Sequence, residues 1–345
     1  MTDALSHRLV RGAELEAITR CGTSVYQQTE WARVVQEGAG YQPVGVLTEA
    51  RAPLALVPWF ETRRGPLRLI GSPLPGCFTP FQRPVWLAEA EGRRREIFEG
   101  QLRFLREHGY ASIEWMLPEP DPEFLSMAGA TGARVTEVPT LLMDIDASVD
   151  AMWKRMESRG RNMVRKAEKA GVAVERCAGG PSDLALFYRM LEGTFAKSGR
   201  RPPHRLRFYR AMLEHLLPKD RLLFLSARAD DRILAMGLFV HDEEEIFFTS
   251  GTSLPGVGAY APNNLIQWSV IQFAVERGLR RYDLGGTGRA SIDRFKLSLG
   301  GYPHAYVGAT WRSPVMRTVA SAYLLARPLL ERARFLTSRT RSGAP

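Results

Sequence analysis

The repeated order of predicted elements in this chain constrains its fold more than any other feature. Each half runs through helix and strand segments to a meander of short apolar strands, then to a helix, and then to one more strand. In the first half these last steps fall at 43–47, 53–60, 94–108 and 112–116. In the second half they fall at 221–227, 233–241, 246–249, 264–277 and 281–284. The repetition predicts a weak internal duplication of one α/β unit of about 140 to 170 residues, a length that suits one domain.

This order predicts a mixed α/β (α+β) fold of two tandem domains, each a mixed sheet flanked by helices, with a basic helix at the C-terminus. A proline-rich stretch and a strand expected at 140–145 set the boundary, so we expect a first domain over residues 1–145 and a second over 146–313. Residues 314–345 form a tail in which apolar residues recur at helical spacing among arginines, with an interruption at Pro328. Its apolar stripe either lies on an anionic membrane surface or packs back on the domain.

Residue usage excludes several classes of protein. With 345 residues, 45% of them apolar, the chain can bury a packed core in each half. Its three cysteines, Cys21, Cys77 and Cys177, stand far apart, which favours a reducing compartment and disfavours a structural zinc site. The six histidines show no metal-ligand spacing and no Gly-x-Ser-x-Gly elbow occurs, so we expect neither a metal centre nor serine catalysis. The chain has no leader-like start and no apolar run of about 18 residues, and we expect a cytoplasmic protein.

The net charge of +10 is unevenly distributed. Residues 1–145 hold 15 arginines, no lysine and 18 acidic residues, a net charge of −3, whereas residues 146–345 hold 32 basic and 19 acidic residues, a net charge of +13. A basic domain attached to a nearly neutral one is typical of a chain that faces a polyanion, whether a nucleic acid, a pyrophosphate or an acidic membrane surface. A solvated basic face without a partner is the alternative. The acidic run at 242–245 lies at a predicted hairpin tip, where we expect a solvated turn.

The basic residues are densest in 152–175, where we expect one helix over 151–170. At helical pitch one face of this helix is cationic, and another carries Met152, Met156 and Met163 toward the core. The donors predicted to bind phosphate groups are Arg155, Arg159, Arg165, Lys166 and Lys169. A solvated helix face is again the alternative.

A second constellation begins where a strand that contains Asp283 opens into the glycines Gly285 and Gly286, whose N–H groups could accept an anion. We expect the next segment, with Phe295 and Lys296, to be a strand, so that alternation turns the aromatic ring to the core and the ammonium to a cleft. Asp283 is either a buried carboxylate that caps backbone N–H groups or a general base. Lys296 is either a surface lysine on an edge strand or a functional group.

Together these segments resemble the Fem-type (FemABX-like) aminoacyltransferases and the related acetyltransferase-like proteins. In the second half the resemblance lies in SRGRNMVRKAEKAGVAVE, FFTSGTS, APNNLIQWSVIQFAVERGLRRYDLGG and RFKLSLGG. In the first half it lies in YQQTEW, GYQPVGVL, LALVPWF and GSPLPG. It covers about residues 20–312, and its strongest parts are the Arg-x-x-x-Arg-Lys-Ala-x-Lys-x-Gly helix exit and the Asp-x-Gly followed by Phe-Lys. The helical arm of some family members is missing.

The resemblance implies two tandem GNAT-like domains, in a family whose typical members take an amino acid from aminoacyl-tRNA and attach it to an amine of a peptidoglycan precursor. It implies that Lys296 lies near the reacting carbonyl, where an ammonium stabilises the oxyanion. Asp283 could accept the proton of the attacking amine, a role that solvent or substrate can also fill. The residues that we expect to line the cleft are Phe295, Tyr260, Asn264, Gly285 and Gly286. We expect no bound cofactor, because the acyl donor is a co-substrate.

Two alternatives stay open. An acyl-CoA-dependent N-acyltransferase, acting on an amino sugar, amino acid or secondary metabolite, would place the pyrophosphate at LPGVGA, 254–259, which is otherwise an ordinary loop. A non-catalytic protein that keeps the fold and binds nucleic acid or a membrane surface is the second alternative. The leading interpretation is a cytoplasmic N-acyltransferase with aminoacyl-tRNA as donor, a cell-wall precursor amine as acceptor, and peripheral contact with the inner membrane surface.

Overall fold

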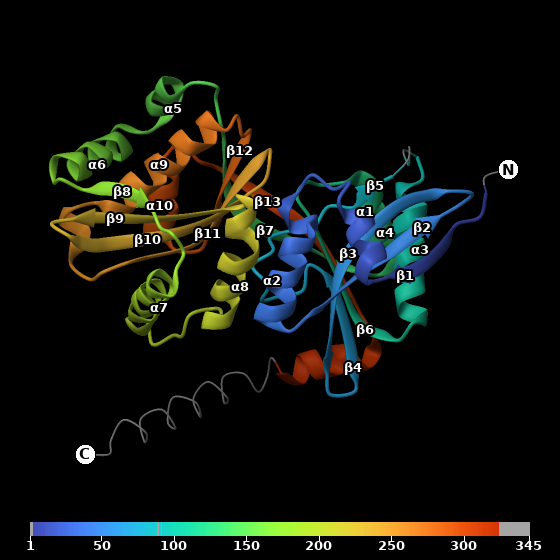
Figure 1. Cartoon of the computed structure of the whole chain (residues 1–345). Helices are drawn as coiled ribbons and strands as arrows, with labels where there is room; N and C mark the ends of the chain where they lie inside the picture. Colours follow the sequence, from blue (N-terminus) through green and yellow to red (C-terminus); the bar gives the residue numbers. More distant parts are fainter. Residues whose placement is uncertain (1–2, 88–89, 91, 324–345) are drawn as a thin grey trace, which may run out of the picture.

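One sheet of 13 strands runs through both halves of the chain (Figure 1). The computed structural model describes residues 3–87, 90 and 92–323. From edge to edge the strand order is β1-β2-β3-β4-β6-β13-β7-β12-β11-β10-β9-β8, and β5 pairs with β3 beside this path. The strands are β1 (Ser6–Val10), β2 (Gln42–Glu49), β3 (Pro53–Arg64), β4 (Leu67–Ser72), β5 (Val85–Trp86), β6 (Tyr110–Leu117), β7 (Arg134–Asp144), β8 (Ala173–Arg176), β9 (Leu222–Ala229), β10 (Arg232–His241), β11 (Glu245–Ser253), β12 (Arg281–Gly286) and β13 (Tyr302–Arg312).

Helices cover the sheet and connect its strands. The α-helices are α1 (Gly12–Thr19), α2 (Thr29–Ala39), α3 (Arg94–Glu107), α4 (Pro122–Thr131), α5 (Val149–Arg155), α6 (Ser158–Lys169), α7 (Pro181–Ala196), α8 (Leu206–Leu216), α9 (Pro262–Glu276) and α10 (Ala290–Ser298). Short 3₁₀ turns are η1 (Val25–Gln27), η2 (Leu217–Lys219) and η3 (Val257–Ala259).

The mixed α/β fold and the repeated order predicted from the sequence are confirmed. In each half three antiparallel strands are followed by a helix and by a strand that pairs in parallel with the third. In this way β6 lies parallel to β4, and β12 lies parallel to β11. A second helix and a long final strand complete each repeat, α4 and β7 in the first half and α10 and β13 in the second.

The final strands of the two repeats lie side by side at the middle of the sheet. β13 pairs with β6 of the first half on one side and with β7 on the other, and β7 pairs with β12 of the second half. Each final strand is therefore hydrogen-bonded to the repeat it does not belong to, and the sheet is continuous. The boundary that we expect after residue 145 falls just after β7.

Both faces of the second half of the sheet are buried, because β9 begins with an unbroken apolar run whose successive side chains point to opposite faces. Leu223 and Leu225 pack into a core with α6 and α9, whereas Leu222 and Phe224 pack into a core with α7 and α8. Figure 1 shows these two pairs of helices on opposite sides of the sheet. In the first half α3 and α4 pack on β2, β3 and β6 around Trp59 and other buried residues.

Helices α2 and α8 pack against each other between the two halves. Trp31 and Val34 on α2 share one core cluster with Phe208 on α8, so this core belongs to both halves. On its exposed side, Nε2 of His215 lies 2.9 Å from a carboxylate oxygen of Glu37. These two residues and the nearby Glu214 are exposed or half-buried, and their contact is an ordinary hydrogen bond at the surface.

The single helix predicted over 151–170 is wrong, because the chain forms two helices, α5 and α6. The backbone between them is extended at Met156 and Glu157, with ψ of 143° and 152°. The N–H of Glu157 donates to the carbonyl of Ser298, 3.0 Å away on α10, and Arg161 donates to carbonyls at the end of α5, including that of Met156. The bond from Glu157 to α10 and the bonds from the guanidinium of Arg161 to the end of α5 therefore stabilise the break between the two helices.

The strand predicted for Phe295 and Lys296 is also wrong, since both residues lie on α10. Ile292, Phe295 and Leu299 follow helical rather than alternating spacing, and Leu299 is fully buried in the core of the second half. Strand alternation therefore does not explain why the side chain of Lys296 points inward. Its position on α10 turns the ammonium inward instead.

The tail is described only in part. Residues 314–323 are helical. Val315, Val319 and Tyr323 of the predicted apolar stripe are 61%, 46% and 58% exposed, whereas Met316 is half-buried. Residues 324–345, with the interruption predicted at Pro328, lie outside the described residues. Within the described part of the chain no helix has the length and apolar character needed to cross a bilayer.

The close packing of α6 on α10 gives a stability prediction. A Cβ at Gly160 would fall on the carbonyl oxygen of Ser298, whereas a Cβ at the exposed helical position Gly193 would meet nothing within 4 Å. Gly160→Ala should lower the free energy of unfolding by about 1–3 kcal/mol because backbone must move. Gly193→Ala should raise it by up to about 1 kcal/mol through helix propensity. Urea denaturation of both variants checks this, and equal effects of the two substitutions would contradict the packing.

Candidate functional site

A cavity of about 450 Å³ opens where β11 and β12 separate. The two strands pair in parallel only from Glu245 to Phe247 on β11 and from Arg281 to Asp283 on β12. Beyond these pairs the gap between them is lined from several elements. The lining residues are Phe78, Thr194, Phe195, Pro203, Met236, Gly237, Phe239, Phe248, Thr249, Ser250, Gly251, Thr252, Ser253, Asn263, Ile266, Gln267, Leu284, Ile292, Phe295 and Lys296. Crevices at the carboxyl ends of strands are usual ligand sites in α/β folds.

Lys296 lines this cavity and is only 6% exposed. Its Nζ donates to the carbonyl oxygens of Gly285 and Gly286, at 2.8 and 2.6 Å. An ammonium has three N–H donors, so one remains for a group in the cavity. Burial lowers the pKa of Lys296, and the carboxylates of Asp283 and Asp293 oppose that shift. The predicted pair Phe295 and Lys296 thus lies at the cavity, with both side chains in its lining.

Asp283 is a buried carboxylate whose oxygens are occupied by neighbours. Oδ1 accepts from the hydroxyl of Thr140 at 2.6 Å and from the N–H of Gly285 at 2.8 Å, while Oδ2 accepts from the hydroxyl of Tyr306 at 2.6 Å. Burial and the nearby Asp283 raise the pKa of Tyr306, which keeps its hydroxyl protonated as a donor. Asp283 thus caps one backbone N–H, as in the first of its two interpretations from the sequence, and its other two partners are hydroxyls.

The other residues expected to line the cleft are arranged differently. Gly285 and Gly286 contribute the carbonyls that hold Lys296. Tyr260 and Asn264 are not among the residues that line the cavity, and Asn263 and Gln267 of α9 are. Asn263 therefore faces the cavity in place of Asn264. Adjacent residues on a helix point in different directions, so an error of one position changes which side chain lines the cavity.

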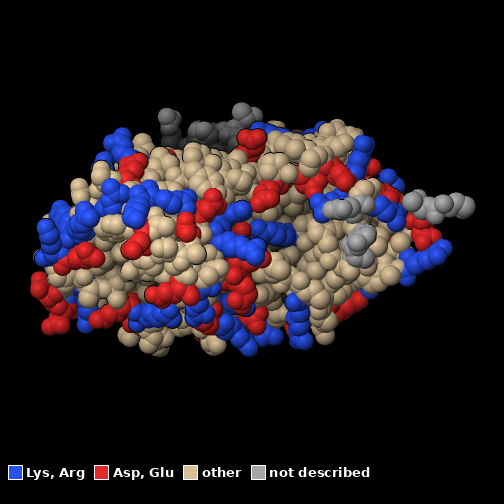
Figure 2. Space-filling view, turned by 90° about the horizontal axis from the view of Figure 1, so that it is seen from above, with Lys and Arg blue, Asp and Glu red and all other residues tan. Residues whose placement is uncertain are grey.

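The predicted phosphate-binding residues lie on the surface. Arg159, Arg165, Lys166 and Lys169 are exposed on α6, and none of them forms an ion pair with another described residue. Arg155 is on α5 instead, where it donates to the carbonyl of Asp144 at 3.0 Å. The helix break separates it from the other four. In Figure 2, Lys and Arg lie over the end of the molecule that α5 and α6 form and elsewhere on the face, with Asp and Glu interspersed among them.

The acidic run 242–245 forms the turn between β10 and β11, as predicted, but only part of it is solvated. Glu243 is exposed and Glu244 is half-buried, whereas Asp242 and Glu245 are buried at the boundary between the two halves. Asp242 and Glu245 are 2% and 6% exposed.

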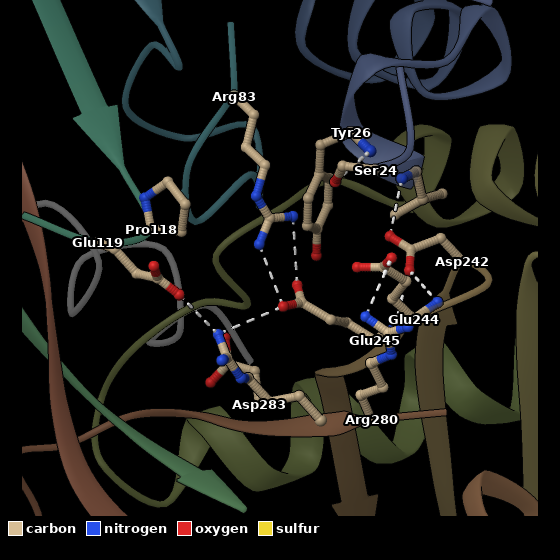
Figure 3. A network of polar contacts seen from close by, with 12 residues as sticks. Ser24, Tyr26, Arg83, Pro118, Glu119, Asp242, Glu244, Glu245, Arg280 and Asp283 are labelled. Carbon is tan, nitrogen blue, oxygen red and sulfur yellow. Dashed lines mark hydrogen bonds and ion pairs between the residues drawn. The ribbon is translucent and has the colours of Figure 1, made fainter. Parts of the chain in front are cut away.

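A carboxylate oxygen of Glu245 lies 3.1 Å from the guanidinium of Arg83 of the first half (Figure 3). The guanidinium of Arg281 lies 3.5 Å from Glu245 and 3.2 Å from Glu119. Burial raises the pKa of Glu245, and the arginines oppose that shift. Ion pairs across the boundary fix the first half against the cavity-bearing second half.

Sequence reasoning missed most of the residues that line the site, and Phe78 is the one that comes from the first half. Phe78, on the loop after β4, lines the cavity with a backbone φ of 55°, which a bulky residue rarely adopts. Its ring centroid lies 3.8 Å from that of His204, which itself lies 4.4 Å from that of Phe208. Burial lowers the pKa of His204 to about 4. No local sequence signal brings these residues together, because they lie in different halves.

The shifted pKa of His204 predicts a pH dependence of stability. The unfolded chain takes up a proton near pH 6.5, the ordinary pKa, whereas folded His204 takes it up only near pH 4. Stability from His204 is therefore present above pH 6.5 and is lost as the pH falls toward 4. As the pH falls from 6.5 to 4, the unfolding free energy of the native chain should therefore decrease relative to that of His204→Phe. A difference that stays constant with pH would contradict the burial of neutral His204.

The comparisons with known proteins agree with this fold. Residues 154–304 match a family model described as an acetyltransferase (GNAT) domain. A comparison with curated proteins gives no match. The chain is similar to the crystal structure of FemX, with 14% identity, a TM-score of 0.67, and coverage of 88% of this chain and 96% of that one.

Two further solved structures resemble the chain. The C-terminal domain of a putative lysylphosphatidylglycerol synthetase from Agrobacterium fabrum has 13% identity and a TM-score of 0.57, over 90% of this chain and 96% of that one. A tandem GNAT protein from the clavulanic acid biosynthesis pathway has 12% identity and a TM-score of 0.56, over 90% and 98%. At such identities these similarities show the fold, and the predicted tandem GNAT architecture and the resemblance to Fem-type structures are confirmed.

Proposed function

We propose that this chain, which carries an acyltransferase domain of the GNAT type, transfers an aminoacyl group from aminoacyl-tRNA to an amine of a peptidoglycan precursor or a similar acceptor. The observation that carries the proposal is Lys296, whose buried ammonium keeps one free N–H donor at the cavity. The structural similarity to FemX supports the choice of donor.

The reaction needs a positioned ester and stabilisation of the charge that develops on it. A neutral amine of the acceptor attacks the ester carbonyl, the new C–N bond forms, and the C–O bond to the tRNA ribose breaks. The free N–H of Lys296 stabilises the negative oxygen of the tetrahedral intermediate. The proton of the amine leaves to solvent or to the departing hydroxyl, because the oxygens of Asp283 already accept three hydrogen bonds. The donor is a co-substrate, and no bound cofactor takes part.

The exposed cations of α6 support a polyanionic donor. Gly160 brings α6 against α10, the helix that carries Lys296, so a nucleic acid held on α6 lies one helix away from the cavity. Phosphates pair well with cations that have no acidic partner. The exposed Val315, Val319 and Tyr323 on the tail support peripheral contact with an anionic membrane on its cytoplasmic side. Sedimentation with phosphatidylglycerol vesicles tests that contact.

A second candidate donor is acyl-CoA. The N-terminus of α9 borders the cavity through Asn263, and the first N–H groups of a helix attract a pyrophosphate. Incubation with charged tRNA, with labelled acetyl-CoA and with neither, in the presence of a pool of amines, separates these donors. Turnover with either one would exclude a non-catalytic binding protein.

The role of Lys296 predicts the effect of removing its ammonium. Lys296→Met should lower the single-turnover rate by about two to three decades, since a lost oxyanion donor costs about 3–4 kcal/mol. Lys296→Arg should restore little of the rate because the guanidinium places its charge differently. Donor affinity and the folded fraction, measured beside the rate, are the controls. A normal rate in Lys296→Met would remove the lysine from the mechanism.

The use of α6 predicts the salt dependence of tRNA binding. Each of Arg159→Glu, Arg165→Glu and Lys166→Glu should reduce the slope of log affinity against log salt by roughly 0.7–0.9 per lost phosphate contact. The control is Arg63→Glu, an exposed arginine of the first half that forms no ion pair with a described residue. It should leave the slope unchanged. Salt-independent transfer from acyl-CoA without measurable tRNA affinity would contradict the tRNA donor.

A further inference from the structure

The lining of the cavity has a chemical character that the proposed reaction does not explain. Most of it is apolar, including five phenylalanines on separate elements: Phe78, Phe195, Phe239, Phe248 and Phe295. None of the described residues that line it is acidic, and Lys296 is the one cation among them. Two of the three donors of that cation are bound to backbone carbonyls. A positively charged side chain would find no counter-ion here, and a buried charge without a partner is unfavourable.

Most hydroxyl groups of the lining lie along one wall, and Asn263 and Gln267 of α9 add two amides. β11 contributes hydroxyls from Thr249, Ser250, Thr252 and Ser253. The hydroxyl of Thr252 lies 2.8 Å from that of Thr194 on α7. Hydroxyl oxygens accept hydrogen bonds, so this wall suits the α-amino group of an aminoacyl ester. The remaining walls then face the side chain of that ester.

Phe78 is the lining residue that the first half contributes. Its ring packs on His204 and lies edge-on to Phe208 and Tyr209, with centroids 5.6 and 6.1 Å away. Its left-handed backbone is one that glycine adopts more easily, and such strain persists where surrounding contacts hold it and often marks a ligand site. Packing on the second half therefore holds this ring as one wall of the cavity.

We propose that the cavity binds the uncharged side chain of an aliphatic or aromatic aminoacyl group, and that Phe78 limits the size of that side chain. The proposal rests on the proposed function, because it names the class of residue transferred. Apolar burial supplies the affinity, and the absence of an acidic partner excludes lysyl groups. The ammonium of Lys296 is directed to the reacting carbonyl, which leaves no free partner for a glutamyl side chain.

The test uses non-hydrolysable 3′-aminoacylamino-3′-deoxyadenosines that carry glycyl, leucyl, tryptophyl, lysyl or glutamyl groups. Calorimetry on the full chain should show the leucyl compound bound at least about tenfold more tightly than the glycyl one, since each buried methylene contributes about fourfold. The lysyl and glutamyl compounds should bind no better than the glycyl one. In Phe78→Ala the affinity for the tryptophyl compound should rise about tenfold relative to the leucyl one, while Phe78→Leu should give a smaller change.

A second variant keeps the test independent of the loop. Ile292 lines the cavity from α10 and is 42% exposed, so Ile292→Glu should fold and should bring an acid into the lining. It should improve binding of the lysyl compound at least about tenfold and weaken that of the leucyl compound. Charged compounds that bind the native chain as tightly as the leucyl one would overturn the proposal. So would unchanged ratios in folded Phe78→Ala and Ile292→Glu.

The failure of the proposed function has a different result. Hexanoyl- and succinyl-pantetheine form the second arm of the experiment. One outcome is that neither the leucyl nor the tryptophyl compound binds, but hexanoyl-pantetheine binds more tightly than succinyl-pantetheine. This would contradict aminoacyl-tRNA as the donor and would support a cavity that selects uncharged acyl groups. Transfer from aminoacyl-tRNA with a preference for lysyl or glutamyl groups would support the proposed function and would contradict the preference for uncharged side chains. Binding of neither series overturns both.

Discussion

The carboxylate of Asp283 joins the three strands at the middle of the sheet. It lies on β12 and accepts hydrogen bonds from Thr140 on β7 and Tyr306 on β13, so it ties together strands from both repeats. It also accepts from the N–H of Gly285, the residue whose carbonyl receives a hydrogen bond from Lys296. A buried carboxylate is costly unless it is hydrogen-bonded, and here its bonds fix the end of β12 on which the lysine depends. The residue that stabilises the sheet is thus also a positioning residue for the site.

The cavity depends on both repeats in a second way. The final strands are shared across the middle of the sheet, and ion pairs from Arg83 and Glu119 of the first half meet Glu245 and Arg281 of the second. These contacts hold the first half where Phe78 can form a wall of a cavity that the second half otherwise builds. Catalytic groups are effective only when they are held in a fixed geometry, and a rigid boundary between the repeats supplies it. The duplication therefore has a functional consequence as well as an architectural one.

Local patterns made much of the fold predictable, and non-local contacts account for what was missed. Apolar runs along β9, β10 and β11 and the spacing of apolar residues along α2 and α3 identified these elements. The long apolar segment of α9, which ends before Gly278, identified that helix. β13 was not predicted, because Pro303 and Gly308 interrupt its pattern and its partners β6 and β7 are far away in the sequence. Glu245 was predicted to be solvated with the rest of its turn, because nothing near it in the sequence indicates its contact with Arg83. Lys296 was found through the family resemblance, whereas Phe78 carries no signal at all.

The central claim is that the network of Asp283 holds Lys296 at the cavity, and a double-mutant cycle on stability tests it most directly. The free energy of unfolding is measured by denaturant for the native chain, Asp283→Asn, Lys296→Met and the double variant. Because Gly285 bonds to both side chains, the double variant should be less destabilised than the sum of the single ones, with a coupling of about 0.5–3 kcal/mol. Effects that add to within about 0.3 kcal/mol would show that the two residues act independently, and would contradict the account.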